Sequence, residues 1–176
     1  MPESPNIIIH IDWSGPHTFE EVTKLDGPTD YGVYQIYGTH HVYGSDVLLY
    51  IGLAAQQTFA TRLAQHQHGW CSGTPDPKRV SYYVGRLFGY ETPDDETWCR
   101  HIDFAERLLI HAHSPAKNTQ KELGGLEPDL RNIQVVNWRS YRDLLPEVTG
   151  ARWTERFDDL GYDKHYSTEH FKKHED

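Results

Sequence analysis

The chain has 176 residues, 37% of them hydrophobic and 12% aromatic, and its 26 acidic and 17 basic side chains give a net charge of −9. This length suits one compact domain, or one small domain with decoration, and the aromatic rings help to provide a modest core. The two cysteines, Cys71 and Cys99, form no CxxC pair, which excludes a disulfide framework, and no apolar run is long enough to span a membrane. We therefore expect a soluble cytoplasmic protein.

Strands dominate the first third of the chain. Branched residues over 6–13 predict a leading strand that ends at a Ser-Gly-Pro sequence, and 19–25 predicts one or two helical turns. Aromatic and branched residues predict two more strands over 31–37 and 47–51. The glycine-containing segment between them suits a hairpin loop, so this pair of strands is expected to be antiparallel.

The next segments alternate helix and strand. An amphipathic pattern predicts a helix over 57–68, a third strand of this region covers 80–88, and the longest helix covers 97–113 and is closed by Pro115. A further strand is expected over 133–138. A loop is expected over 71–76, and two short helices are expected over 139–145 and 152–160. The last fifteen residues are expected to fray.

These elements predict an α+β fold, in which a small, mainly antiparallel β-sheet is flanked by helices. We expect residues 1–30 to form an N-terminal extension packed on the core. The core itself is expected over 31–120, and a C-terminal strand and helical extension over 121–176. Together these parts are expected to form a single compact domain.

Two tripeptides on the paired strands carry a recognisable pattern. Gly32-Val33-Tyr34 and Tyr50-Ile51-Gly52 resemble the paired signature of the GIY-YIG nuclease superfamily, which usually has isoleucine in place of Val33. The family pattern continues with an arginine on the first helix, a histidine one turn later, a glutamate on a later helix and an asparagine beyond it. This chain matches those four positions, in order, with Arg62, His66, Glu106 and Asn118. The resemblance spans residues 31–118.

The resemblance implies an endonuclease that hydrolyses phosphodiester bonds in DNA, of a restriction or repair type. It implies that Tyr34 is the general base that activates water, that Arg62 stabilises the phosphate, and that His66 and Tyr50 assist. Asn118 is expected to brace the site. A tyrosine with an ordinary pKa near 10 needs cationic neighbours to act as a base at neutral pH. RNA stays open as a substrate, and a double-strand cut from one site per chain requires a homodimer or two sequential nicks.

The chemistry of Glu106 supports a metal site. Its neighbours on the predicted helix are apolar, including Ile102, Leu109 and Ile110, and a carboxylate among them is costly to bury unless it is paired or binds a cation. One carboxylate, completed by waters and a phosphate oxygen, suits magnesium (Mg²⁺) or manganese (Mn²⁺). We therefore expect Glu106 to be the metal ligand.

Each of these residues also has a structural interpretation when taken alone. Tyr34 and Tyr50 suit a cross-strand aromatic pair, and Glu106 suits an ion pair. The alternative function is therefore a non-catalytic nucleic-acid-binding or protein-interaction module that retains the fold. A third hypothesis, histidine-based metal binding, rests on twelve histidines, but they show neither an HExxH motif nor zinc-finger spacing.

Charge and aromatic residues give mixed indications about a nucleic-acid partner. Residues 47–90 carry four basic and one acidic side chain, whereas residues 1–46 carry one basic and seven acidic. The basic segment holds half of the motif, so the charge neither proves nor excludes a DNA-binding face. Aromatic and basic residues also alternate near the C-terminus, which suits a stacking surface, but acidic residues interrupt them and we favour packing. Those residues are Trp138, Arg139, Tyr141, Arg142, Arg152, Trp153 and Arg156.

Overall fold

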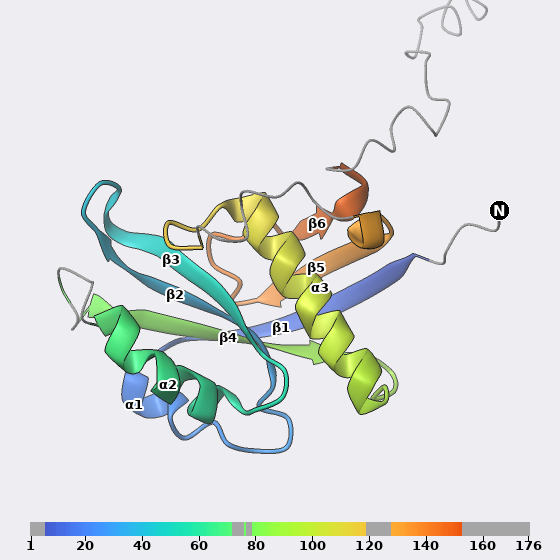
Figure 1. Cartoon of the computed structure of the whole chain (residues 1–176), viewed down its shortest axis with the longest axis horizontal. Coiled ribbons are helices and arrows are strands. Elements are labelled where there is room, and N and C mark those ends of the chain that lie inside the picture. Colours follow the sequence, from blue (N-terminus) through green and yellow to red (C-terminus); the bar gives the residue numbers. More distant parts are fainter. Residues whose placement is uncertain (1–5, 72–75, 77–78, 119–127, 153–176) are drawn as a thin grey trace, which may run out of the picture.

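A six-stranded mixed sheet with the strand order β3-β2-β4-β1-β5-β6 organises the computed structural model (Figure 1). The structure describes residues 6–71, 76, 79–118 and 128–152, with backbone alone for 66–71. The strands are β1 (Ile7–His17), β2 (Gly32–His40), β3 (Gly44–Ala54), β4 (Ser81–Phe88), β5 (Ile133–Arg139) and β6 (Glu147–Thr149). The helices are α1 (Phe19–Val22), α2 (Phe59–Cys71) and α3 (Asp95–His113), with 3-10 turns η2 (Pro128–Leu130) and η3 (Gly150–Arg152).

The strand pairing agrees with an α+β fold. β2 pairs antiparallel with β3 and β4, β1 pairs antiparallel with β4, and β5 pairs antiparallel with β6. The exception is β1 with β5, which run parallel. The hairpin predicted between the two tripeptide strands is confirmed. β1 is an interior strand, because β4 and β5 lie on either side of it.

Helices cover the two faces of this sheet unequally. α3 packs on one face, where a large core gathers residues of β1, β2, β4 and β5 together with the buried side of the helix. A smaller core lies on the opposite face, where α1 and α2 cover residues of β2, β3 and β4, including Tyr34, Ile36 and Val84. This second core contains no residue of β1 or β5, so that part of the sheet is left without a helical cover in the described structure.

Polar caps place the ends of α3. The Asp94 side chain accepts a hydrogen bond from the Thr97 backbone N–H at 2.9 Å, so the helix begins two residues before the predicted start. It ends at Ser114, which has a left-handed conformation with φ of 44° and precedes Pro115. No helix of the described residues is long and apolar enough to cross a membrane.

The predicted helix over 139–145 is wrong. Arg139 and Arg142 have φ values of 61° and 55°, and the left-handed region interrupts a right-handed helix at both positions. The segment instead turns back into β6, held by Asn137, whose side-chain amide donates to the Leu145 carbonyl at 2.8 Å. The predicted loop over 71–76, the helix over 152–160 and the frayed last fifteen residues lie almost entirely outside the described residues.

Candidate active site

Tyr34 and Tyr50 lie on neighbouring strands and point to the face of the sheet that α2 covers. Their ring centroids are 6.1 Å apart and their planes are tilted by 35°. Tyr34 lies opposite Gly52 in the pairing of β2 with β3. A Cβ atom on Gly52 would lie 2.5 Å from the Tyr34 hydroxyl and 2.6 Å from the Tyr50 ring. The last residue of the second tripeptide therefore has to be glycine so that both rings fit beside it.

Arg62 projects from α2 toward Tyr34. The Tyr34 side chain has no exposed surface. Among the described residues, neither its hydroxyl nor the Nε atom of Arg62 has a partner in good hydrogen-bond geometry, although both atoms are shielded from solvent and the two side chains lie close enough for Arg62 to lower the pKa of Tyr34. Two neighbouring buried polar atoms without partners are uncommon in folded proteins and are typical of sites that are completed by a ligand.

The pKa values of the two tyrosines show that four predicted residues act on one another electrostatically. Burial raises the pKa of Tyr34 well above its ordinary value, the charges of Tyr50 and Glu106 raise it further, and Arg62 opposes them. Burial also raises the pKa of Tyr50, again with Glu106 raising it and Arg62 lowering it. Side chains from β2, β3, α2 and α3 are thus electrostatically coupled, and both phenols are neutral at pH 7.

Glu106 is the only acidic member of this group. It lies on the buried side of α3 and is 3% exposed. No three His, Cys, Asp or Glu side chains of the described structure are grouped so that they could hold a metal ion. One carboxylate fits a hydrated magnesium or manganese ion that takes its other ligands from water and phosphate. It does not fit a structural zinc ion, which needs four protein ligands.

Asn118 holds the strand that carries Tyr50. Its side-chain carbonyl accepts from the Ile51 N–H at 2.9 Å, and its amide donates to the Ile51 carbonyl at 2.8 Å. The two preceding residues also donate backbone hydrogen bonds to β3, Ala116 to Leu48 and Lys117 to Leu49. The segment after α3 therefore closes the edge of β3, and Asn118 is a positioning residue next to the tyrosines.

The backbone of His66 lies in α2, one turn after Arg62. The structure does not describe its side chain, so the role of His66 remains a prediction.

An ion pair beside the first tripeptide was not predicted from the sequence. The Arg86 guanidinium contacts the Asp30 carboxylate at 2.5 Å and lies 5.7 Å from the centre of the Phe59 ring. The Asp30 carbonyl accepts from the Phe59 N–H at 2.9 Å, and the Asp30 carboxylate accepts from the Gly27 N–H at 2.8 Å. This pair ties β4 and the start of α2 to the turn before β2. The only sign of this ion pair in the sequence is an acidic residue two positions before a Gly-x-Tyr sequence.

Comparisons with known proteins identify no relative of this chain. No family model matches the chain, and neither the curated proteins nor the solved structures include a significant match.

Proposed function

We propose that the chain is a metal-dependent endonuclease of the GIY-YIG type, which hydrolyses phosphodiester bonds in DNA. The observation that carries the proposal is that Arg62 and Glu106 both act electrostatically on Tyr34 and Tyr50, although the four residues come from four separate elements. Two polar atoms of this group are buried without a hydrogen-bond partner. A buried cluster of an acid, a cation and two phenols with shifted pKa values is a frequent property of catalytic sites.

Arg62 has the clearest role in this proposal. Its planar guanidinium suits two oxygens of a phosphate, where negative charge develops as water attacks. Its Nε has no partner in the described structure, so binding a phosphate there would break no hydrogen bond of that atom. Glu106 would hold a magnesium or manganese ion, which supplies positive charge to the phosphate and to the attacking water when bound.

Tyr34 can take the proton of the attacking water only after its own hydroxyl proton has left. Burial opposes that loss most, Tyr50 and Glu106 oppose it further, and Arg62 favours it. The proposed base thus depends on positive charge at the site, from Arg62 and from a cation that neutralises Glu106. Tyr50, which is half-buried beside it, is placed to hydrogen-bond the same water or phosphate oxygen.

The expected substrate and assembly follow from the resemblance to the GIY-YIG superfamily. A small restriction or repair enzyme would act on duplex DNA, and a double-strand cut would need two copies of the chain or two successive nicks. RNA as substrate is a separate outcome of the same assay.

The test is cleavage of mixed plasmid and phage DNA in magnesium, in manganese or in EDTA. Glu106→Gln and Arg62→Gln are each expected to lower the rate by about 10²- to 10³-fold, the loss that follows removal of one group that stabilises a transition state. Glu96→Gln is the matched control, because it changes an exposed acidic residue on the same helix. Folded wild-type protein that cuts none of these substrates in either metal would contradict the proposal.

A non-catalytic module is the second candidate, and the raised pKa values of both tyrosines favour it. Neutral buried phenols suit a packed aromatic pair as well as a resting active site. This candidate predicts DNA or protein binding that is unchanged by EDTA and by Glu106→Gln. Binding of that kind, without any cleavage, would replace the nuclease proposal.

A further inference from the structure

Three adjacent strands carry a row of rings, two exposed and one half-buried, on the part of the sheet that no described helix covers. Phe88 of β4 lies opposite His10 of β1, and Trp138 follows on β5. The His10 ring is 5.6 Å from Phe88 and 6.1 Å from Trp138 between centroids. Phe88 is 51% exposed and Trp138 is 48% exposed. These three rings form the aromatic row.

The aromatic row is held in place by the fold. The Trp138 indole N–H donates to Nδ1 of His10 at 3.2 Å, which fixes the histidine between its two neighbours. Trp138 was expected to be a packing residue, yet nearly half of its surface contacts solvent. Large rings that are exposed together on a rigid surface lose little conformational freedom on binding, and they usually mark a contact with a partner.

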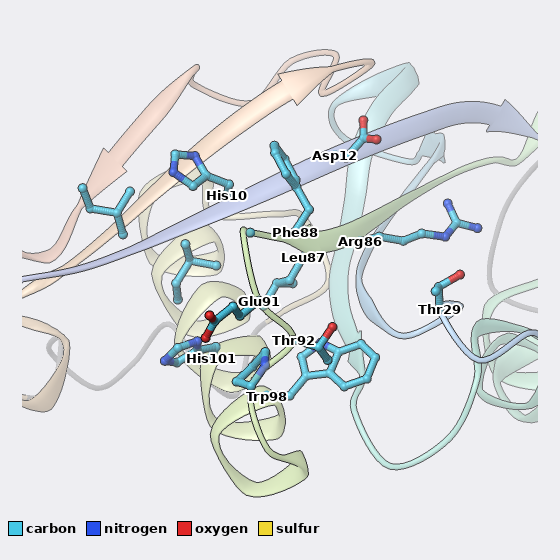
Figure 2. A pocket seen from close by; sticks show the side chains of 14 residues that line it. His10, Asp12, Thr29, Arg86, Leu87, Phe88, Glu91, Thr92, Trp98 and His101 are labelled. Carbon is cyan, nitrogen blue, oxygen red and sulfur yellow. The ribbon is translucent and has the colours of Figure 1, made fainter.

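A cavity of about 540 Å³ adjoins the row (Figure 2). It opens where β4 continues past the start of β2, and it is also bounded by the loop 89–93 and the start of α3. Figure 2 shows His10 and Phe88 on one side of β1, with Trp98 on the α3 side. Two carboxylates, those of Asp12 and Glu91, and the Thr29 hydroxyl also line it. The lining therefore combines ring faces with hydrogen-bond acceptors.

We propose that the aromatic row and this cavity bind unpaired bases of a single-stranded nucleic acid, so that bases stack on the rings and a base amino group meets the carboxylates. Every base offers a flat face for stacking, and an exposed sheet with aromatic side chains on adjacent strands suits that contact. A phosphate would not enter the cavity itself, because its one arginine, Arg86, is already paired with Asp30. Acceptor groups without a free cation favour the base edge over the backbone.

One cation lies where the strand backbone would run. Arg139 follows Trp138 directly, is 76% exposed and pairs with Asp12 at 3.0 Å. An ion pair this exposed contributes little stability, so the guanidinium can turn to a phosphate at small cost. A single contact of this kind predicts weak salt dependence, with a slope of about −0.7 in log affinity against log salt.

The placement of the aromatic row links it to the proposed catalytic group. Tyr34 on β2 faces the same side of the sheet, because Tyr34 pairs with Val84, and Phe88 lies four residues further along the same strand. This proposal rests on the proposed function only in its last step, that the bound strand belongs to the DNA substrate. Binding to the aromatic row itself needs neither metal nor cleavage.

The test is binding of fluorescent oligonucleotides to Glu106→Gln protein in EDTA, where cleavage cannot interfere. Single-stranded DNA and RNA of mixed sequence are expected to bind, and a blunt duplex is expected to bind weakly. Phe88→Leu and Trp138→Leu should each weaken single-strand binding by roughly 5- to 150-fold, the effect of losing one stacked base. Arg139→Gln should remove most of the salt dependence.

Tyr43→Leu is the matched control, because Tyr43 is also exposed and stacks on a histidine, His40, at 4.8 Å on the β2–β3 hairpin. It should bind as strongly as the parent protein. Equal weakening by the control, unchanged binding by both aromatic-row variants, or preference for duplex would overturn the proposal. Thermal melting of each variant separates loss of the site from loss of the fold. Single-strand binding without any cleavage by the wild type would leave the aromatic-row proposal intact and refute the nuclease.

Discussion

Gly52→Ala gives the sharpest test of how the two tyrosines are packed. The added methyl carbon would lie 2.5 Å from both the Cζ and the hydroxyl oxygen of Tyr34, and 2.6 Å from Cε1 of Tyr50. Contacts of that length are far inside van der Waals distance, so at least one ring has to move. Tyr34 has no exposed surface, whereas Tyr50 is half-buried and can move toward solvent more easily.

The expected cost is that of overpacking a core, about 1–3 kcal/mol of unfolding free energy. For a chain of this size, this corresponds to a fall in Tm of roughly 2–12 °C. The proposed nuclease activity should fall further than stability alone explains, because the shifted rings are the proposed catalytic groups. Urea unfolding measures the first effect, and the cleavage rate well below the Tm measures the second.

Gly89→Ala is the control, since its added carbon would meet only the Glu91 carbonyl oxygen, at the ordinary distance of 3.8 Å. It should leave the unfolding free energy within about 0.5 kcal/mol of the wild type. If Gly52→Ala were as stable and as active as Gly89→Ala, the Tyr34 ring would not lie across Gly52. The described active-site geometry would then be refuted.

Three further predictions concern the surroundings of this site. Asn118→Ala should cost about 1–3 kcal/mol in urea unfolding, because it leaves the N–H and carbonyl of Ile51 without their side-chain partner; an unchanged midpoint would show that the edge of β3 does not need this residue. In an alkaline absorbance titration, three tyrosines of the described structure should ionise at a higher pH than a tyrosine with an ordinary pKa. Burial raises their pKa above the unfolded value, so their contribution to stability is complete below about pH 10 and is lost above it; the three are Tyr34, Tyr37 and Tyr50. Burial lowers the pKa of His113, whose Nε2 accepts from the Leu145 N–H at 2.8 Å. Its contribution is therefore present above about pH 6.5 and is lost as the pH falls through the folded pKa, and His113→Gln should flatten the dependence of Tm on pH in that range.

Local patterns were sufficient to predict most of the secondary structure. The strands around the two tripeptides and the amphipathic helices α2 and α3 agree with the predicted segments to within a few residues. Each is determined by the alternation or spacing of its own apolar side chains. The short strand β6 was missed for the same reason, because its three residues carry too little pattern. The left-handed conformations of Arg139 and Arg142 have no local signal in the sequence either, because tertiary contacts of that segment stabilise them.

The long-range pairings had no local signal. Nothing in the spacing of residues shows that β1 runs parallel to β5, a strand more than a hundred residues later. The Asp30–Arg86 ion pair likewise joins residues whose separation is set by the whole fold. The meeting of Tyr34, Arg62 and Glu106 was expected from the resemblance of their order to a family pattern, and not from any property of the three residues themselves. The electrostatic coupling of these residues is the physical observation that agrees with that expectation.

The protonation state of Tyr34 and Tyr50 is a property of the site that the sequence pattern does not predict. Burial and Glu106 both stabilise the neutral phenols, and Arg62 is the described cation that lowers the pKa of both. The resting group therefore disfavours the phenolate that a general base requires, and neutralising Glu106 would remove one of the opposing effects, which for Tyr34 also include burial and Tyr50. If Glu106 held a cation, loss of its negative charge would lower the pKa of Tyr34 and favour loss of the phenolic proton. In a nuclease this coupling would confine the reactive phenolate to the metal-bound state. In a binding module the coupling would have no catalytic use.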